Sequence, residues 1–298
     1  MAAQNAITLL DGGTGQELIA RIGEDPRPLW SAWVMMERPD LVAAVHRDFI
    51  AAGAEVITLN TYSVTPRRLQ RHSAGERFLE LQQAAIEIAH RAREGAAHPV
   101  RLAGCLPPLV NSYVPHLAPN AADAAREYAE LVAPQAPHVD IILAETMATI
   151  TEAVAATRAG ADSGLPIWTG LTVDDHDGHR LRSGEPLDEA LDAVVEAGAD
   201  ALLLNCSRPE AIGAALPTLA RHGLPFGAYA NGFTAAVDLD YATTVDVLVA
   251  RTDLGPAAYA DHVDGWIAAG ATIVGGCCET GPAHIAEIAR RLGKPAQI

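Results

Sequence analysis

The chain is poor in basic residues and has almost no lysine. Of its 298 residues, 37 are acidic and 21 are lysine or arginine, so the formal net charge is −16 at pH 7. The only lysine is Lys294, close to the end. Schiff-base aldolases and pyridoxal enzymes need a buried lysine amine, so both chemistries are excluded. The acidic balance repels phosphate backbones, so we expect no nucleic-acid partner, whereas a cationic small molecule meets no overall repulsion.

Long apolar runs and targeting signals are also missing. No hydrophobic run approaches the roughly 18 residues of a membrane span. Residues 1–6 have neither the basic stretch nor the long apolar run of a secretory signal. We therefore expect a cytoplasmic protein with no membrane partner, and the sequence leaves its oligomeric state open. Hydrophobic residues make up 49% of the chain, enough to bury a large core.

What the chain does contain is a regular alternation of short apolar runs with longer amphipathic stretches. The apolar runs predict strands at Ile7–Asp11, Glu55–Asn60, Val100–Gly104, Asp140–Glu145, Ile167–Thr172, Ala201–Asn205, Phe226–Ala230 and Thr272–Gly275. The amphipathic stretches predict helices at Pro39–Ala52, Gly75–Arg93, Ala121–Ala133, Ile150–Ala159, Leu187–Ala197, Pro209–His222, Ala257–Ala269 and Pro282–Leu292. Eight strand–helix units without a linker predict an α/β fold, a single (β/α)8 TIM barrel domain over residues 1–298.

A doubly wound open sheet is the alternative architecture. Such a sheet usually carries a glycine-rich dinucleotide or phosphate signature after its first strand. The corresponding turn here, residues 11–17, has glycine at 13 and 15 but Leu18 at the third glycine position, and it lacks the lysine of a phosphate loop. Because neither signature is met, the closed barrel is the preferred interpretation.

Three of the four cysteines follow predicted strands whose carboxyl ends share one rim of the barrel. Cys206 ends the sixth strand, and Cys277 and Cys278 follow the eighth. Thiolates are strong zinc ligands, and three protein ligands with one open position are typical of catalytic zinc. The alternatives are a packed cysteine and a strained disulfide between Cys277 and Cys278. Because all three cysteines lie on one rim, zinc binding is favoured over both. We read Cys105 as a small packed residue.

The backbone between the eighth strand and its cysteines needs to bend sharply if both cysteines are to bind one metal ion. Gly275 and Gly276 precede the pair, and we expect their conformational freedom to supply the bend. Two further patterns are set aside. The run Asp174-Asp175-His176-Asp177-Gly178-His179 fits no calcium or zinc motif and is interpreted as a solvated loop. The cluster Arg67-Arg68-Leu69-Gln70-Arg71 is interpreted as a helix surface.

Several short motifs, taken together, resemble the homocysteine S-methyltransferase family, whose members use S-methylmethionine, S-adenosylmethionine or betaine as methyl donor. The resemblance covers nearly the whole chain. Its motifs are Leu10-Asp11-Gly12-Gly13-Thr14-Gly15, Leu29-Trp30-Ser31-Ala32, Asn60-Thr61-Tyr62, Ala103-Gly104-Cys105, Ala144-Glu145-Thr146, Asn205-Cys206-Ser207 and Gly275-Gly276-Cys277-Cys278-Glu279-Thr280. The cysteine pair after two glycines is the specific element. At Cys105 the family more often has serine.

The resemblance implies how the substrates are held. The thiol of homocysteine takes the open zinc position, where it is deprotonated to the nucleophilic thiolate. Asp11 and Glu145 face the substrate ammonium, and backbone amides around Gly12 and Gly13, with Thr61, face its carboxylate. The alternative for the two acidic residues is capping of the following helices.

The methyl donor is expected to be cationic at its reacting centre. Aromatic faces often recognise cationic methyl groups, and Trp30 is our candidate for this contact. The motif Leu29-Trp30-Ser31-Ala32 resembles the users of sulfonium donors more than the users of betaine. A sulfonium is therefore the first choice and betaine the second. Two other classes remain open, a zinc-dependent hydrolase and a non-catalytic thiol or metal sensor, and ligation by three thiolates disfavours the hydrolase.

Overall fold

Eight parallel strands form a closed barrel, which confirms the predicted fold class. The computed structural model describes residues 7–25, 27–236 and 248–297, so residues 1–6, assessed above for a targeting signal, lie outside it. The strands are β1 (Thr8–Leu9), β2 (Val56–Thr58), β3 (Arg101–Leu106), β4 (Ile141–Met147), β5 (Ile167–Leu171), β6 (Ala201–Asn205), β7 (Phe226–Tyr229) and β8 (Ile273–Val274). Each pairs with its neighbours in chain order, and β1 pairs with β8. A parallel bridge between Leu10 and Val56 closes the ring.

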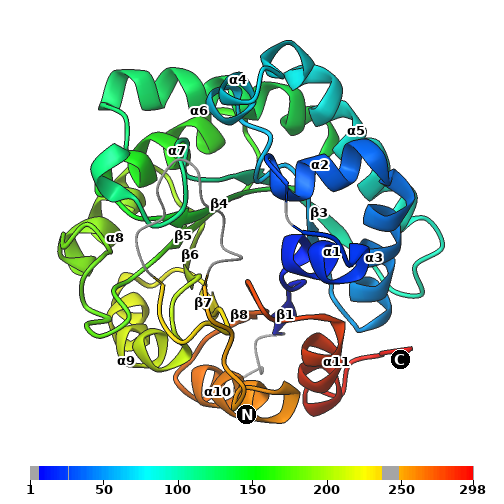
Figure 1. Cartoon of the computed structure of the whole chain (residues 1–298). Coiled ribbons are helices and arrows are strands. Elements are labelled where there is room, and N and C mark those ends of the chain that lie inside the picture. The colour runs from blue at the N-terminus through cyan, green and yellow to red at the C-terminus, as the bar shows by residue number, and fades with distance from the viewer. Residues whose placement is uncertain (1–6, 26, 237–247, 298) are drawn as a thin grey trace.

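Helices surround the strands on the outside (Figure 1). They are α1 (Thr14–Ile22), α2 (Trp30–Glu37), α3 (Pro39–Ala51), α4 (Pro66–Arg71), α5 (Phe78–Arg93), α6 (Ala121–Gln135), α7 (Ile150–Asp162), α8 (Leu187–Glu196), α9 (Pro209–Leu219), α10 (Pro256–Ala268) and α11 (Pro282–Arg291). Proline in the first turn of α3, α4, α9, α10 and α11 suits helix starts, where its missing N–H is not needed. No described helix is long and apolar enough to cross a bilayer.

The first, second and eighth strands were predicted too long, and three helices were not predicted. β1, β2 and β8 are shorter than expected because the chain leaves the sheet before its polar loop residues, whereas β4 continues past Glu145 to Met147. The unpredicted helices are α1, α2 and α4. Of these, α1 is amphipathic but has only nine residues, α2 has eight and is apolar on nearly every side, and α4 has only six, so none gives a long amphipathic pattern.

The core has two shells, and their arrangement decides where a site can lie. The larger shell packs the outward faces of the strands against the helices. A smaller one fills the barrel interior with inward-facing side chains, among them Leu143, Trp168, Leu203 and Tyr229. Because these inward-facing side chains fill the barrel interior, a cavity can open only at the carboxyl ends of the strands.

Candidate metal and substrate site

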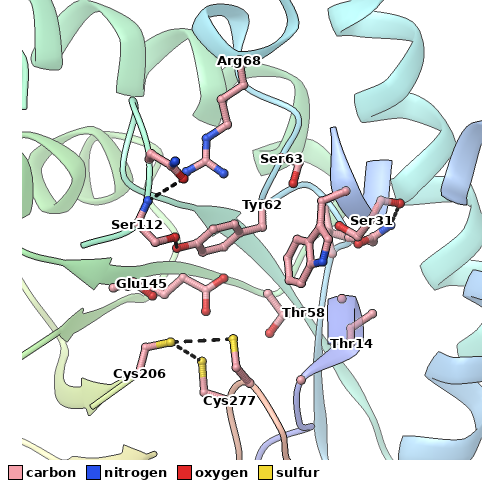
Figure 2. Close-up of a pocket in the computed structure, with 18 of the residues that line it drawn as sticks. Thr14, Ser31, Thr58, Tyr62, Ser63, Arg68, Ser112, Glu145, Cys206 and Cys277 are labelled. Atoms are coloured by element: carbon pink, nitrogen blue, oxygen red, sulfur yellow. Dashed lines mark hydrogen bonds between the residues drawn. The ribbon is translucent and has the colours of Figure 1, made fainter. Parts of the chain in front are cut away.

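The structure brings Cys206, Cys277 and Cys278 together at the carboxyl end of the barrel. Their sulfurs all lie within 4.8 Å of one another, with 3.0 Å between Cys206 and Cys277 and 3.9 Å between Cys206 and Cys278 (Figure 2). Backbone hydrogen bonds set this register: the N–H of Cys206 donates to Tyr229 O, and the N–H of Cys277 donates to Ala230 O. Both cysteine loops are thus tied to the end of β7, which lies between β6 and β8.

Three thiols this close together cannot all ionise without a cation. Hydrogen bonds from Cys277 and Cys278 hold the pKa of Cys206 well below its ordinary range. The pKa values of Cys277 and Cys278 are raised, first of all because each donates its proton to Cys206. Cys206 is therefore the most acidic of the three thiols, and a bound divalent ion would favour loss of the protons of Cys277 and Cys278.

The backbone around the cavity is strained where side chains must point inward. Among the described residues, the non-glycine residues with positive φ are Leu29, Trp30, Ser73, Tyr113, Thr146, Cys206 and Glu279. All but Ser73 and Glu279 line one cavity, and Glu279 directly follows Cys278. Such conformations cost on the order of 1–3 kcal/mol each and persist where the surroundings fix them, which marks this end of the barrel as the functional one.

Gly275 and Gly276 have a different role from the one expected. Neither has a positive φ among the described glycines; the left-handed residues of the two cysteine loops are Cys206, with φ of 51°, and Glu279, with φ of 64°. A Cβ on Gly275 would lie 2.6 Å from Leu10 Cβ, and one on Gly276 would clash with the Thr280 side chain. The glycines therefore permit close packing of the loop rather than an unusual backbone conformation.

A tyrosine and an arginine that sequence reasoning missed support Cys206. The hydroxyl of Tyr113 lies 2.8 Å from Cys206 Sγ. The guanidinium of Arg182 lies 4.7 Å from the centre of the Tyr113 ring and donates to the Cys206 carbonyl at 3.2 Å. Arg182 is held by a buried ion pair with Asp175 at 3.0 Å. The predicted solvated loop is therefore wrong for Asp175, although His176, Asp177 and His179 are exposed.

Asp11 and Glu145 both line the cavity and carry raised pKa values. Burial raises the pKa of Asp11 from 3.8 to about 8, with a smaller increase from the charge of Glu145, against hydrogen bonds from Thr58 that lower it. Burial likewise raises the pKa of Glu145 from 4.5 to about 7. Two carboxyl groups in one cavity, one buried and one half-buried, form a site for a cation.

The end of β4 is locked so that Glu145 faces the cavity. The side-chain amide of Asn205 accepts a hydrogen bond from Thr146 N at 2.8 Å and donates to Thr146 Oγ1 at 2.9 Å. Cys105 Sγ donates to Glu145 Oε1 at 3.0 Å. Cys105 is buried, as predicted for a packed residue, and it stands outside the three-sulfur cluster.

The cavity has a volume of about 290 Å³ and contains most of the predicted substrate residues. The Trp30 and Tyr62 rings lie edge to face in its wall, 6.5 Å apart. The Trp30 ring packs where any side chain at position 15 would be, so Gly15 is required there. Gly12, Gly13 and Thr14 also line the cavity.

Two of the expected carboxylate contacts are placed differently. Thr61 follows a tight turn after β2, in which its N–H donates to Leu59 O, and its side chain is buried and is not among those that line the cavity. The Gly13 N–H is not open to a substrate either, since it donates to Thr280 O at 2.9 Å. The arginine cluster is also more than a helix surface, because Arg68 and Arg71 line the cavity.

The comparison with known protein families fits this geometry. The sequence model of the homocysteine S-methyltransferase family matches residues 8–292. The chain belongs to this family. The homocysteine S-methyltransferase of Escherichia coli is 31% identical, with 96% of this chain and 95% of that protein covered. Homocysteine S-methyltransferase 4 of Zea mays is 29% identical, with 95% and 89% covered.

Solved structures of the same family agree with the sequence relatives. The homocysteine methyltransferase MmuM from Escherichia coli, in its metallated form, has a TM-score of 0.79 and 28% identity, with 96% of each chain covered. Its apo form has a TM-score of 0.70. As a member of the homocysteine S-methyltransferase family, this chain is a methyltransferase, and its three-cysteine cluster is a candidate metal site.

Proposed function

We propose that this enzyme transfers a methyl group from a sulfonium donor to the zinc-bound thiolate of homocysteine. The observation that carries the proposal is one cavity with three cysteine sulfurs within 4.8 Å of one another and a pair of carboxyl groups whose pKa values are raised by burial. A non-catalytic sensor would need only the sulfurs. A zinc hydrolase would need a stronger Lewis acid than three thiolates leave.

Zinc suits the donor set. Zn–S bonds of about 2.3 Å in a tetrahedral site place sulfurs about 3.8 Å apart, so small side-chain rotations of the three cysteines suffice. Soft thiolate ligands favour zinc over magnesium or calcium. When bound, zinc would hold the substrate thiol as a thiolate, and the electron density of three cysteine ligands would keep that sulfur nucleophilic.

The residues of the chain orient the acceptor. Asp11 and Glu145 bind its ammonium, which replaces their protons and relieves the charge that their burial disfavours. The carboxylate faces the N-terminus of α1, where Thr14 lines the cavity and its Oγ1 is buried without a hydrogen-bond partner among the described residues. The Gly12 N–H, which makes no hydrogen bond within the described residues, is a second donor.

The aromatic wall binds the donor and excludes water from it. Trp30 and Tyr62 line the cavity, and the face of an aromatic ring attracts a sulfonium methyl group. The acceptor sulfur attacks the methyl carbon as the bond to the donor sulfur breaks, and the donor leaves as a neutral thioether. Loss of the positive charge weakens its hold on the aromatic wall and favours release. Betaine is the second candidate for the donor.

Side-by-side turnover tests the assignment. The purified enzyme is given homocysteine with S-methylmethionine, S-adenosylmethionine or betaine, and methionine is measured together with bound zinc. We expect methionine from at least one sulfonium, dependent on zinc. Turnover with betaine alone would reverse the donor assignment, and full activity in metal-free protein would overturn the role of zinc.

A further inference from the structure

Arg68 carries a positive charge at the end of the cavity opposite the cysteines. It belongs to α4, whose N-terminus is capped by Thr65, and it lies beyond Tyr62 as seen from the sulfurs (Figure 2). Its Nη2 donates to Pro108 O at 3.0 Å. Within the described ranges its Nε is buried without a hydrogen-bond partner and no carboxylate forms an ion pair with it. The nearby carboxyl group of Glu152 has a pKa raised by burial, which the charge of Arg68 partly opposes.

The preceding residue, Arg67, forms the kind of ion pair that Arg68 lacks among the described residues. Arg67 makes two hydrogen bonds of 2.6 Å to the carboxylate of Glu127, so its charge is neutralised outside the cavity. Arg68 has no such partner, and its guanidinium is held 5.0 Å from the centre of the Tyr62 ring. A half-buried guanidinium positioned in this way, with an unused Nε donor, matches a carboxylate, and binding an anion would offset the cost of its partial burial.

The order of groups along the cavity indicates whose carboxylate this is. The acceptor occupies the sulfur end, with its ammonium at Asp11 and Glu145. In-line attack on a methyl group requires the donor to extend away from the acceptor sulfur, along Tyr62 and toward Arg68. An acceptor anchored at Glu145 would leave the Arg68 end of the cavity to this second molecule.

We propose that Arg68 binds the carboxylate of the methyl donor and so selects donors of the amino-acid type over simple sulfonium ions. This inference rests on the proposed function, because it takes a sulfonium as the donor. Arg68 acts as a specificity residue: it touches the donor far from the reacting atoms, so it governs donor binding more than the rate of methyl transfer.

Donor kinetics with a matched pair of donors test this assignment. S-methylmethionine and its carboxamide differ only in the carboxylate. For Arg68→Gln we expect the KM of S-methylmethionine to rise about 10- to 100-fold, as for loss of a charged hydrogen bond. The KM of the carboxamide and that of homocysteine are expected to stay within about twofold, with kcat changed little. Arg68→Lys keeps the charge and should show a smaller rise.

Several outcomes would contradict the inference. Arg158→Gln, an exposed arginine on α7, is the control and should match the wild type with both donors. If Arg68→Gln affects both donors equally, Arg68 only supports the Pro108 loop and the inference fails. An unchanged KM for S-methylmethionine also overturns it. If the zinc-loaded wild type uses no sulfonium donor at all, the proposed function fails, which is a separate result.

Discussion

At the scale of single residues, the carboxyl pair of the cavity responds to pH unlike surface carboxylates. The pKa of Asp11 is about 8 and that of Glu145 about 7, both raised mainly by burial. These pKa values exceed those of the unfolded chain. The contribution of the pair to the free energy of unfolding is therefore fully present below about pH 4 and is lost as the pH rises toward 8. A bound ammonium reverses the effect by stabilising the ionised carboxylates.

This protonation predicts that ligand binding releases protons. At pH 7 we expect 2-aminobutyrate, which has the ammonium and carboxylate of the acceptor but no thiol, to displace protons from Asp11 and Glu145. The measurement is the dependence of calorimetric binding enthalpy on the ionisation enthalpy of the buffer. Glu145→Gln should bind at least about tenfold more weakly and release fewer protons. Equal proton release in both proteins would remove Glu145 from the ammonium site.

His46 on α3 gives a second pH dependence, of opposite sign. Its ring is fully buried, neither ring nitrogen has a partner among the described residues, and burial lowers its pKa from 6.5 to about 4. The unfolded chain takes up this proton first, so stability falls as the pH drops from 6.5 toward 4.

Replacing the histidine should remove this loss. His46→Leu is expected to be more stable than the wild type at pH 4.5 by up to about 3 kcal/mol, with a smaller difference at pH 7. Urea unfolding at the two pH values measures it, with the exposed His176→Leu as control. If the wild type and His46→Leu lose the same stability on acidification, the ring is not the cause.

At the scale of structural elements, the first βα loop supports the cysteine loop after β8. A Cβ on Gly13 would lie 2.5 Å from the Cys277 carbonyl oxygen. We therefore expect Gly13→Ala to push the cysteine loop away and weaken zinc binding at least tenfold, measured by competition with a chromophoric chelator. Gly265→Ala in α10 is the control: nothing lies within 4 Å of its new Cβ, so zinc binding should stay and stability should rise by about 0.5–1 kcal/mol. Unchanged zinc affinity in Gly13→Ala would show that the first βα loop does not support the cysteine loop.

The strands could be predicted from the sequence, whereas the contacts between the loops could not. The eight strands were found because parallel strands covered on both faces are continuous apolar runs, and Cys206 and Cys277 follow two of them. The contact of Tyr113 with Cys206 joins positions 93 residues apart through loops without periodicity, so no local pattern indicates it. Asp175 is buried because Arg182 and the backbone N–H groups of Arg208 and Ala236 all bind its carboxylate, which the acidic run does not reveal.

At the scale of the whole molecule, the barrel does not depend on the metal for its closure. The bridge from Leu10 to Val56 contains no cysteine, and of the three clustered cysteines only Cys277 packs against one of the two apolar shells. Removal of zinc with a chelator should therefore abolish methyl transfer and lower the melting temperature, since a ligand of the native state stabilises it, while circular dichroism at 25 °C stays unchanged. Loss of helical signal on chelation would show that the metal holds the fold itself.

The number of sulfurs around zinc tests the central claim most directly. X-ray absorption of the zinc-loaded enzyme should show three sulfur ligands from Cys206, Cys277 and Cys278, and four after homocysteine is added. Cys206→Ala should lose zinc or a sulfur ligand, whereas Cys105→Ala should keep all three. A sulfur count that does not rise with homocysteine, in a protein that still forms methionine, would contradict a metal-bound acceptor.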